Sequence, residues 1–423
     1  MLQFCLCFFK IISQSMEYKM IKNQYKKRMS TLAMTVSILT LAACGGNTSK
    51  NPAGIQSVRV FGDSLADSGV FSLKATVNNA GTDGSPTPIW TELVAKQLSV
   101  TGVCNFYKIN PLNVSISTDT ACKSFAVSGA RINNLSNTNP AFSGLKSPAS
   151  IAYQMDTAAL SVQGNFPANE LILIDGGGND AADILGTYLA FETGTTLQKA
   201  QYVALLGTLL MPDTVQSMII QPATTTNSLS GAQQLGVLYM TALANKIADD
   251  INNKLLAKGA SKVAIMNVPA ITSTPRFKLV LKNIAASSAG IKGAAGAESL
   301  ARYWIGSFNQ TLNNRFKADK RVIIVDFFAG LDRQLTAPAA YGLSNPISSI
   351  TGVIDTACPI TGIDTVGLPV YNFSTCTALA LDQSPQASKW RKMSFADGFH
   401  PSPYTHTLMA QLVNRTLSTR FWM

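Results

Sequence analysis

Four short apolar runs are the clearest pattern in this chain, and each has the length and composition of a buried β-strand. Unbroken runs of Val, Ile and Leu are typical of parallel strands that are covered on both faces. Between the runs lie longer segments in which apolar residues recur at helical spacing. We therefore predict an α/β fold, with a central parallel sheet and helices on both faces. The predicted strands are Val58–Phe61, Leu171–Ile174, Val263–Met266 and Val322–Val325, and the predicted helices are Pro88–Leu98, Ala232–Leu256 and Leu300–Phe316.

Polar residues with catalytic potential follow two of the predicted strands. Gly62-Asp63-Ser64-Leu65 comes directly after the first strand, and Gly177-Gly178-Asn179-Asp180 follows the second. Sites in open α/β sheets gather at the carboxyl ends of the strands, so both segments are expected at one edge. Near the C-terminus, Asp397-Gly-Phe-His400 offers an imidazole and a carboxylate. A serine hydroxyl becomes a nucleophile when an imidazole takes its proton and a carboxylate orients that imidazole, which predicts a Ser64–His400–Asp397 triad.

These blocks, together with Ala126-Val-Ser-Gly129-Ala130 between them, resemble the GDSL family of lipases and esterases, also called SGNH hydrolases. Two further segments carry the resemblance. Ile89–Leu98 is similar to the family's segment after the first block, and Lys258–Pro269 is similar to a strand of its lipase branch, which includes phospholipases and lecithinase-like enzymes. The resemblance extends from Val58 to Leu412.

The resemblance implies a three-layer, flavodoxin-like fold and the hydrolysis of carboxylic esters, with lipids, phospholipids included, as the favoured substrates. It also implies an oxyanion hole made of the backbone N–H groups of Ser64 and Gly129 and the side-chain amide of Asn179. Asp63 and Asp180, which neighbour these residues, are expected to stabilise turns and not to take part in the chemistry.

Two other functions stay open at this point. Within ester chemistry, the substrate could be an acetylated polysaccharide or a short-chain ester. In another class, the chain could be a surface-binding lipoprotein that retained the fold without catalysis. The presence of a complete triad together with Gly129 and Asn179 argues against the binding protein, because binding alone does not need these five residues.

The segment Gly176–Ala181 also fits the G-x-G-x-x-A pattern of dinucleotide-binding proteins. That interpretation requires an acidic residue about 20 positions later, and residues 197–201 contain none. A metal site at Asp397, His400 and His406 lacks a convincing third ligand, so we interpret His406 as a packing or hydrogen-bonding residue. We therefore expect no cofactor and no metal.

The N-terminus has the pattern of a bacterial lipoprotein signal. A basic segment around Lys22–Arg28 precedes an uncharged, largely apolar run from Thr31 to Ala43, which is too short for a comfortable membrane span. Cys44 follows Leu-Ala-Ala and is the predicted lipidation site, with Gly45 after it typical of sorting to the outer membrane. Residues 1–43 would be the signal peptide and residues 44–54 a lipidated tether. An ordinary secretory signal is the alternative. Translation could begin at the methionine at position 16, 20 or 29.

Four cysteines remain after the signal region and its cleavage site. Cys104 and Cys122 are 18 positions apart, and so are Cys358 and Cys376. Four cysteines permit three pairings, and we choose the local one, Cys104–Cys122 with Cys358–Cys376. Disulfides persist in oxidising compartments, which agrees with export.

Charge excludes one class of partner. The chain carries +11, but residues 1–43 contain six basic residues and one acidic residue, so +6 remains on the rest. Without a Lys/Arg run that could follow phosphates, we expect no nucleic acid partner.

Residues 55–423 are predicted to form one hydrolase domain, with insertions near 187–230 and 332–394. The second insertion leads into the Asp397–His400 block and could form a lid or a substrate wall. The sequence leaves the oligomeric state open.

Overall fold

The computed structural model describes residue 51 and residues 53–110, 113–137, 139–224, 228–344, 355–365 and 367–423. The predicted signal peptide, the Cys44 lipidation site and most of the tether lie outside these residues. Within the described segments, no helix combines the length and the apolar character that a membrane crossing requires.

The central sheet has four parallel strands among the described residues, and they coincide with the four predicted runs. Its spatial order is β1-β4-β5-β6. An isolated parallel bridge joins Val60 of β1 to Ser124, so the chain around Ser124 borders the other edge of β1. With that segment counted as the second strand, the order is 2-1-3-4-5, as in flavodoxin-like folds. The strands are β1 (Ser57–Phe61), β4 (Glu170–Ile174), β5 (Val263–Met266) and β6 (Val322–Val325).

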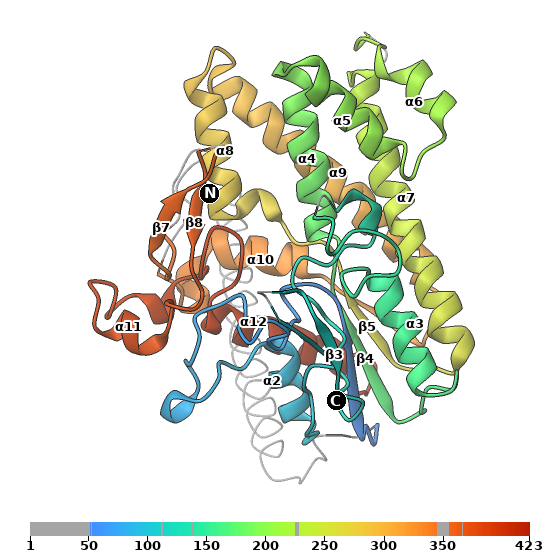
Figure 1. Ribbon diagram of the computed structural model, residues 1–423, viewed down its shortest axis with the longest axis vertical. Helices are drawn as coiled ribbons and strands as arrows, with labels where there is room; N and C mark the ends of the chain where they lie inside the picture. The colour runs from blue at the N-terminus through green and yellow to red at the C-terminus, as the bar shows by residue number, and fades with distance from the viewer. Residues whose placement is uncertain are drawn as a thin grey trace, which may run out of the picture. The chain divides into compact units, whose positions relative to one another are not determined.

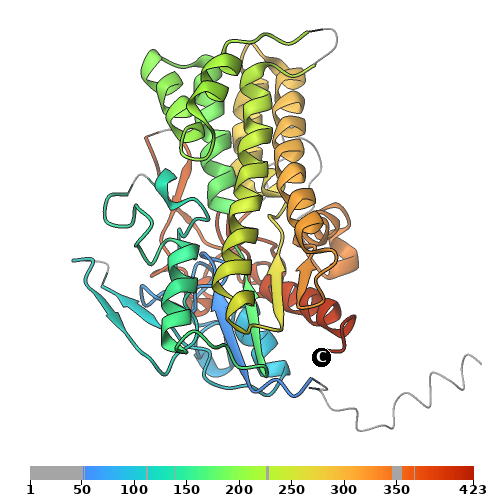
Figure 2. The same cartoon turned by 90° about the vertical axis from the view of Figure 1, so that its right-hand side faces the viewer.

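Helices cover both faces of the sheet, which confirms the predicted fold class. Successive residues of a strand point to opposite faces, so Leu171 and Leu173 of β4 enter one core while Ile172 and Ile174 enter the other. Figures 1 and 2 show the three layers, with α7 and α9 side by side and extending beyond the carboxyl ends of the strands. One layer contains α3 (Ile151–Ser161), α4 (Gly178–Thr193), α7 (Gly231–Lys254) and α9 (Gly290–Phe316), and the other contains α2 (Trp90–Gln97), α10 (Phe327–Thr336) and α12 (Pro403–Ser418).

Two of the three predicted helices have the expected extent, and the third prediction was too short. Helix α9 begins at Gly290, ten residues before the predicted start at Leu300. Its first turns contain three glycines and few large apolar residues, so they lack the periodicity that marks a helix. These turns are helical because they pack against the preceding helix α8 (Pro275–Ala286). Tertiary packing overrides a weak local preference there.

Smaller elements lie outside the three layers. Helices α5 (Thr196–Leu206) and α6 (Pro212–Ile219) follow α4 in the first predicted insertion, which begins inside α4 itself. The second begins inside α10 and contains the hairpin β7 (Ile360–Ile363) and β8 (Pro369–Tyr371), followed by α11 (Ala378–Asp382). Another hairpin joins β2 (Tyr107–Ile109) to β3 (Ile116–Thr118). Disulfides join Cys104 to Cys122 and Cys358 to Cys376, which is the local pairing that we predicted.

Candidate active site

Ser64 lies in a tight turn directly after β1, at the carboxyl edge of the sheet. Gly62 opens the turn, and both its N–H and its carbonyl bond to the side-chain amide of Gln154 from α3, at 2.9 and 3.0 Å. The next N–H, from Asp63, donates to Asp175 Oδ1 at 3.0 Å. The Asp63 carboxylate then accepts the Leu65 N–H at 3.0 Å and closes the turn. Sequence-distant side chains therefore position the hydroxyl of Ser64.

His400 and Asp397 lie in a closed loop immediately before α12. Two backbone hydrogen bonds hold the two sides of the loop together. The Ala396 N–H donates to the carbonyl of His400 at 2.8 Å, and the Ser402 N–H donates to the carbonyl of Ser394 at 3.0 Å. Ser402 also caps α12, with Pro403 at the first helical position. A helix start that is fixed by its cap leaves little freedom to the loop before it.

The three residues of the predicted triad meet, although 336 positions separate Ser64 from His400. The Ser64 Oγ lies 2.9 Å from His400 Nε2, and His400 Nδ1 lies 2.9 Å from Asp397 Oδ2. The other carboxylate oxygen, Asp397 Oδ1, accepts the backbone N–H groups of Phe399 and His400, at 2.8 and 2.6 Å. Such a chain of hydrogen bonds can move a proton from the serine to the imidazole and hold the imidazole in one tautomer.

The charges and hydrogen bonds of His400 and Asp397 suit His400 to act as a base that holds a proton during turnover. Burial by itself would lower the pKa of His400, but the charge of Asp397 and its hydrogen bond raise that pKa above the ordinary value, with a further contribution from Asp63. Burial alone would raise the pKa of Asp397, yet the His400 charge and the hydrogen bonds from His400 and Phe399 lower it. An imidazolium at position 400 is thus stabilised beside an ionised carboxylate.

The predicted oxyanion donors lie on two segments that border the nucleophile turn. Gly129 has a φ of 82°, a left-handed conformation that favours glycine. Asn179 is in the first turn of α4. The helix begins after Gly177, whose φ is 92°. The Asn179 amide donates to the carbonyl of Ala130 at 3.0 Å. Its contact with Asp63 Oδ2 is long, at 3.5 Å, so that N–H remains available for a stronger acceptor.

Three charged residues that we did not predict hold the Gly129 segment in place. Asp67 accepts the N–H and the hydroxyl of Ser128, at 2.8 and 2.6 Å. Arg131 donates to the carbonyl of Gly129 at 2.8 Å and forms a two-bond ion pair with Asp183, at 2.6 and 3.1 Å. Asp183 lies one helical turn after Asn179, so Arg131 connects the two predicted donor segments. No local pattern marks these pairs, because their partners are far apart in sequence.

The other polar residues near the site have structural partners. Asp180 accepts the N–H groups of Ile132 and Asn133, at 3.0 and 2.8 Å, and burial raises its pKa to about 6. His406 is buried and accepts the N–H of Trp90 at 3.4 Å; burial, with lesser effects of Lys74 and His400, lowers its pKa to about 3. In the part of the chain that the structure describes, no three His, Cys, Asp or Glu side chains gather as metal ligands.

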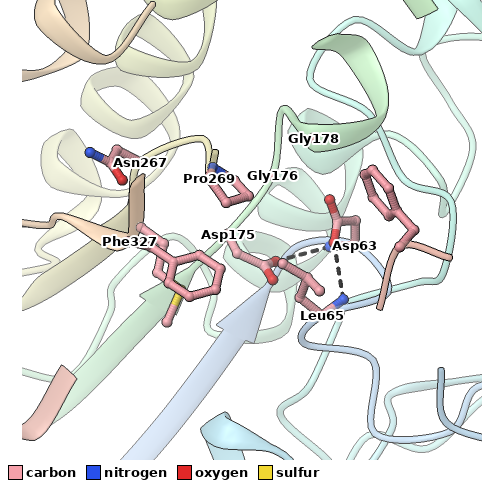
Figure 3. Close-up of a pocket in the computed structure, with 10 residues that line it drawn as sticks. Asp63, Leu65, Asp175, Gly176, Gly178, Asn267, Pro269 and Phe327 are labelled. Carbon is pink, nitrogen blue, oxygen red and sulfur yellow. Dashed lines mark hydrogen bonds between the residues drawn. The ribbon is translucent and has the colours of Figure 1, made fainter. Parts of the chain in front are cut away.

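A small cavity of about 20 Å³ lies behind the nucleophile turn. Figure 3 shows Asp175, Asp63 and Leu65 around it, with the two hydrogen bonds that hold the turn. Its other lining residues come from the carboxyl ends of the strands, from the segments that directly follow them, and from the loop that carries Asp397 and His400, which we call the catalytic loop. They are Gly176, Gly178, Met266, Asn267, Pro269, Phe327 and Phe399.

Two aromatic rings flank the imidazole of His400. Phe399 and Phe373 each make an edge contact with it, at centroid distances of 5.6 and 5.8 Å. Phe373 follows β8 in the disulfide-bonded segment, and the N–H of Cys358 in the same segment donates to the carbonyl of Ala396 at 2.7 Å. The second predicted insertion therefore contacts the catalytic loop directly.

The chain is similar to known lipases. The GDSL-like Lipase/Acylhydrolase family matches residues 58–413. No curated protein matches the chain significantly. Among solved structures, phospholipase A1 from Streptomyces albidoflavus NA297 aligns at 15% identity and a TM-score of 0.38, covering 86% of this chain and 99% of that one. The lipase Lip_vut3 from a goat rumen metagenome aligns at 12% identity and a TM-score of 0.36, covering 86% and 97%. An extracellular lipase from Streptomyces rimosus aligns at 14% identity and a TM-score of 0.35, covering 85% and 99%.

Proposed function

The chain belongs to the GDSL-like lipase/acylhydrolase family, and on that premise we propose that it hydrolyses carboxylic esters through a Ser64–His400–Asp397 triad. The observation that carries the proposal is the continuous chain of hydrogen bonds from the Ser64 hydroxyl through His400 to Asp397. A surface-binding protein would have no use for that arrangement at the carboxyl edge of the sheet.

The reaction proceeds through an acyl-enzyme. Ser64 Oγ attacks the ester carbonyl carbon while its proton passes to His400 Nε2. The oxyanion that forms is bound by the N–H groups of Ser64 and Gly129 and by the Asn179 amide. The intermediate collapses, and the leaving alcohol takes the proton from His400. Water then gives a proton to His400 and attacks the acyl group, and Ser64 recovers its proton as the acid departs.

The proposal is tested with residues 45–423 produced in an oxidising compartment. We would measure turnover of soluble esters from acetate to palmitate, and of phospholipid vesicles, and label the protein with a fluorophosphonate. Turnover of esters together with a phosphonyl group on Ser64 is the expected result. A folded protein without turnover on any ester, or with the label on another serine only, would return the surface-binding alternative to first place.

Within this chemistry we propose a lipid ester as the substrate and an exported lipoprotein as the form of the enzyme. The support is the similarity of Lys258–Pro269 to the lipase branch and the position of Cys44 after the apolar run. An anchor on Cys44 would hold the enzyme at a membrane, where lipid esters are concentrated. We expect labelled palmitate to enter the wild-type protein in cells but not Cys44→Ser. Equal labelling of both would rule out Cys44 as the lipidated residue.

The Asn179 amide is expected to contribute a large share of catalysis. Asn179→Ala removes one oxyanion donor, so kcat should fall about 100- to 1000-fold with KM little changed. Asn179→Asp keeps the shape but presents oxygen and negative charge to the oxyanion, so the loss should be greater. Steady-state kinetics on one soluble ester measures both variants. Equal activity of Asn179→Asp and wild type would contradict this role.

We also propose that the segment closed by Cys358–Cys376 is a wall of the substrate site. Each disulfide closes a loop of 18 positions, so replacing either pair by serines should lower the free energy of unfolding by about 3 kcal/mol. Only loss of Cys358–Cys376 should also change the preference for acyl length, because that segment contacts the catalytic loop. The Cys104–Cys122 pair is the matched control. Identical chain-length profiles in both double variants would refute the wall.

A further inference from the structure

We propose that Asp175 is a positioning residue for the nucleophile and that it performs this role as a neutral carboxylic acid. The inference rests on the proposed function, because it assigns a further role at the same site. It concerns a residue that takes no part in the triad or the oxyanion hole.

Asp175 holds the turn that presents Ser64. It directly follows β4, which pairs in parallel with β1, and its N–H donates to the carbonyl of Phe61, the last residue of β1, at 3.1 Å. Its side chain then reaches past the strand end, and Oδ1 accepts the N–H of Asp63 at 3.0 Å. Figure 3 shows this bond at the base of the turn. Asp63 immediately precedes Ser64, so the carboxyl of Asp175 fixes the peptide that leads into the nucleophile.

The turn is shaped to admit this carboxyl. A Cβ on Gly62 would overlap Asp175 Oδ1, and the φ of Gly62 is 153°. The absence of a side chain at position 62 is therefore the condition for Asp175 to approach the Asp63 N–H. The contact depends on Gly62 and on Asp175, which are far apart in sequence. This argues against an incidental contact between the carboxyl and the turn.

The second carboxyl oxygen has a different environment. Asp175 is 2% exposed, and its Oδ2 has no hydrogen-bond partner among the described residues. Asp175 lines the cavity behind the turn, whose 20 Å³ has room for one water molecule. An ionised carboxylate with one backbone donor would be costly in this apolar cavity, whereas a neutral acid can bond to a water there.

The charges around Asp175 also favour its neutral form. Burial raises the pKa of Asp175 well above its usual range, and the negative charges of Asp63 and Asp67 on the nucleophile segment raise it further, although the backbone N–H groups of Asp63 and of Asp175 itself lower it. From the catalytic loop, the cavity is lined by Phe399, and from β5 by Met266 and the amide-bearing Asn267. None of these three side chains brings a positive charge that would offset the repulsion.

A neutral acid at this position has a chemical consequence. The N–H of Ser64 is a proposed oxyanion donor, and a negative charge beneath its turn would oppose the developing oxyanion. Ionisation of Asp175 at alkaline pH should therefore lower kcat, which would give the pH profile an alkaline limb that belongs to this residue.

The test compares Asp175→Asn with Asp175→Leu in the full enzyme, by measuring kcat and KM for a soluble ester against pH. Asparagine keeps the shape and an acceptor for the Asp63 N–H and cannot ionise, so kcat should stay within about threefold of wild type and the alkaline limb should disappear. Leucine keeps the branching but accepts no hydrogen bond, so kcat should fall about 10- to 100-fold with KM little changed. The rate of phosphonylation of Ser64 should fall by the same factor.

Glu170→Gln is the matched control, because it removes a buried carboxylate at the opposite end of β4, where Glu170 bonds to Arg59 and Lys123. It should lower the melting temperature and leave the pH profile unchanged.

An infrared difference spectrum of wild type against Asp175→Asn should contain the band of a protonated carboxyl group at neutral pH. A carboxylate band, or a folded Asp175→Leu with wild-type kcat and pH profile, would overturn the proposal. Failure of the proposed function itself is distinguishable, because the wild type would then lack ester turnover, or Ser64→Ala would keep it, whereas the infrared band reports the protonation of Asp175 without any turnover.

Discussion

Replacing Ser64 with alanine is expected to lower kcat for ester hydrolysis by about a millionfold, and replacing His400 with alanine by a similar factor. The two side chains share one proton across a 2.9 Å hydrogen bond, so each is useless in the chemical step without the other. The double variant should therefore be no slower than either single variant. Residual turnover above the uncatalysed rate would come from the oxyanion donors and substrate binding. Single-turnover kinetics on a soluble ester measures all three variants.

The second histidine provides the control for this prediction. His406 lies on the buried face of α12 and accepts the backbone N–H of Trp90, so His406→Asn should destabilise the fold and change kcat only slightly. If His406→Asn removed activity and His400→Ala did not, the identity of the base would be wrong. If the losses in Ser64→Ala and His400→Ala multiplied in the double variant, the two residues would act in separate steps.

Asp397→Asn is expected to lower kcat by about ten thousandfold without unfolding the protein. The amide that replaces the carboxylate would present a donor to His400 Nδ1 and stabilise the tautomer that cannot accept the Ser64 proton. The same change removes the charge that raises the pKa of His400. His400 is active as a base only when it is neutral, so activity falls as pH drops through that pKa. The acidic limb of kcat/KM should consequently move to lower pH in Asp397→Asn.

A matched carboxylate, Asp382, lies upstream of Asp397 in the second predicted insertion. Asp382 pairs with Arg391 and Trp390 on the surface, and Asp382→Asn should leave both kcat and the acidic limb unchanged. An unshifted acidic limb in Asp397→Asn would show that another group controls the protonation of His400.

The central sheet was predictable because its strands are buried on both faces and therefore consist of unbroken apolar runs. The same reasoning missed the first turns of α9 and did not anticipate the two hairpins or the remaining helices, which are α3, α4, α5, α6, α8, α10, α11 and α12. Those elements have short, mixed or glycine-containing sequences, and they form because neighbouring elements cover them. Local periodicity carries no information about such cover.

The blocks around Ser64, Gly129, Asn179 and His400 could be recognised in the sequence because each one is local. The residues that hold these blocks in place could not be recognised in the sequence. Asp67 acts on Ser128, Arg131 on Asp183, and Asp175 on Asp63, and in each pair the two residues belong to different segments. An aspartate or arginine in isolation is far more often a surface charge, so composition does not single these out.

By itself, the sequence determined the fold class, the four strands of the sheet and the family, whereas it left three pairings of the cysteines open. Each of the determined features depends on patterns within short stretches, namely apolar runs and motifs. The tertiary structure alone decided the 2.9 Å approach of Ser64 to His400, the ion pair that joins the two donor segments, the aromatic ring of Phe373 at the imidazole, and the buried carboxyl beneath the nucleophile. These are contacts between distant segments, whose geometry is set by packing over the whole sheet and not by any one stretch of the chain.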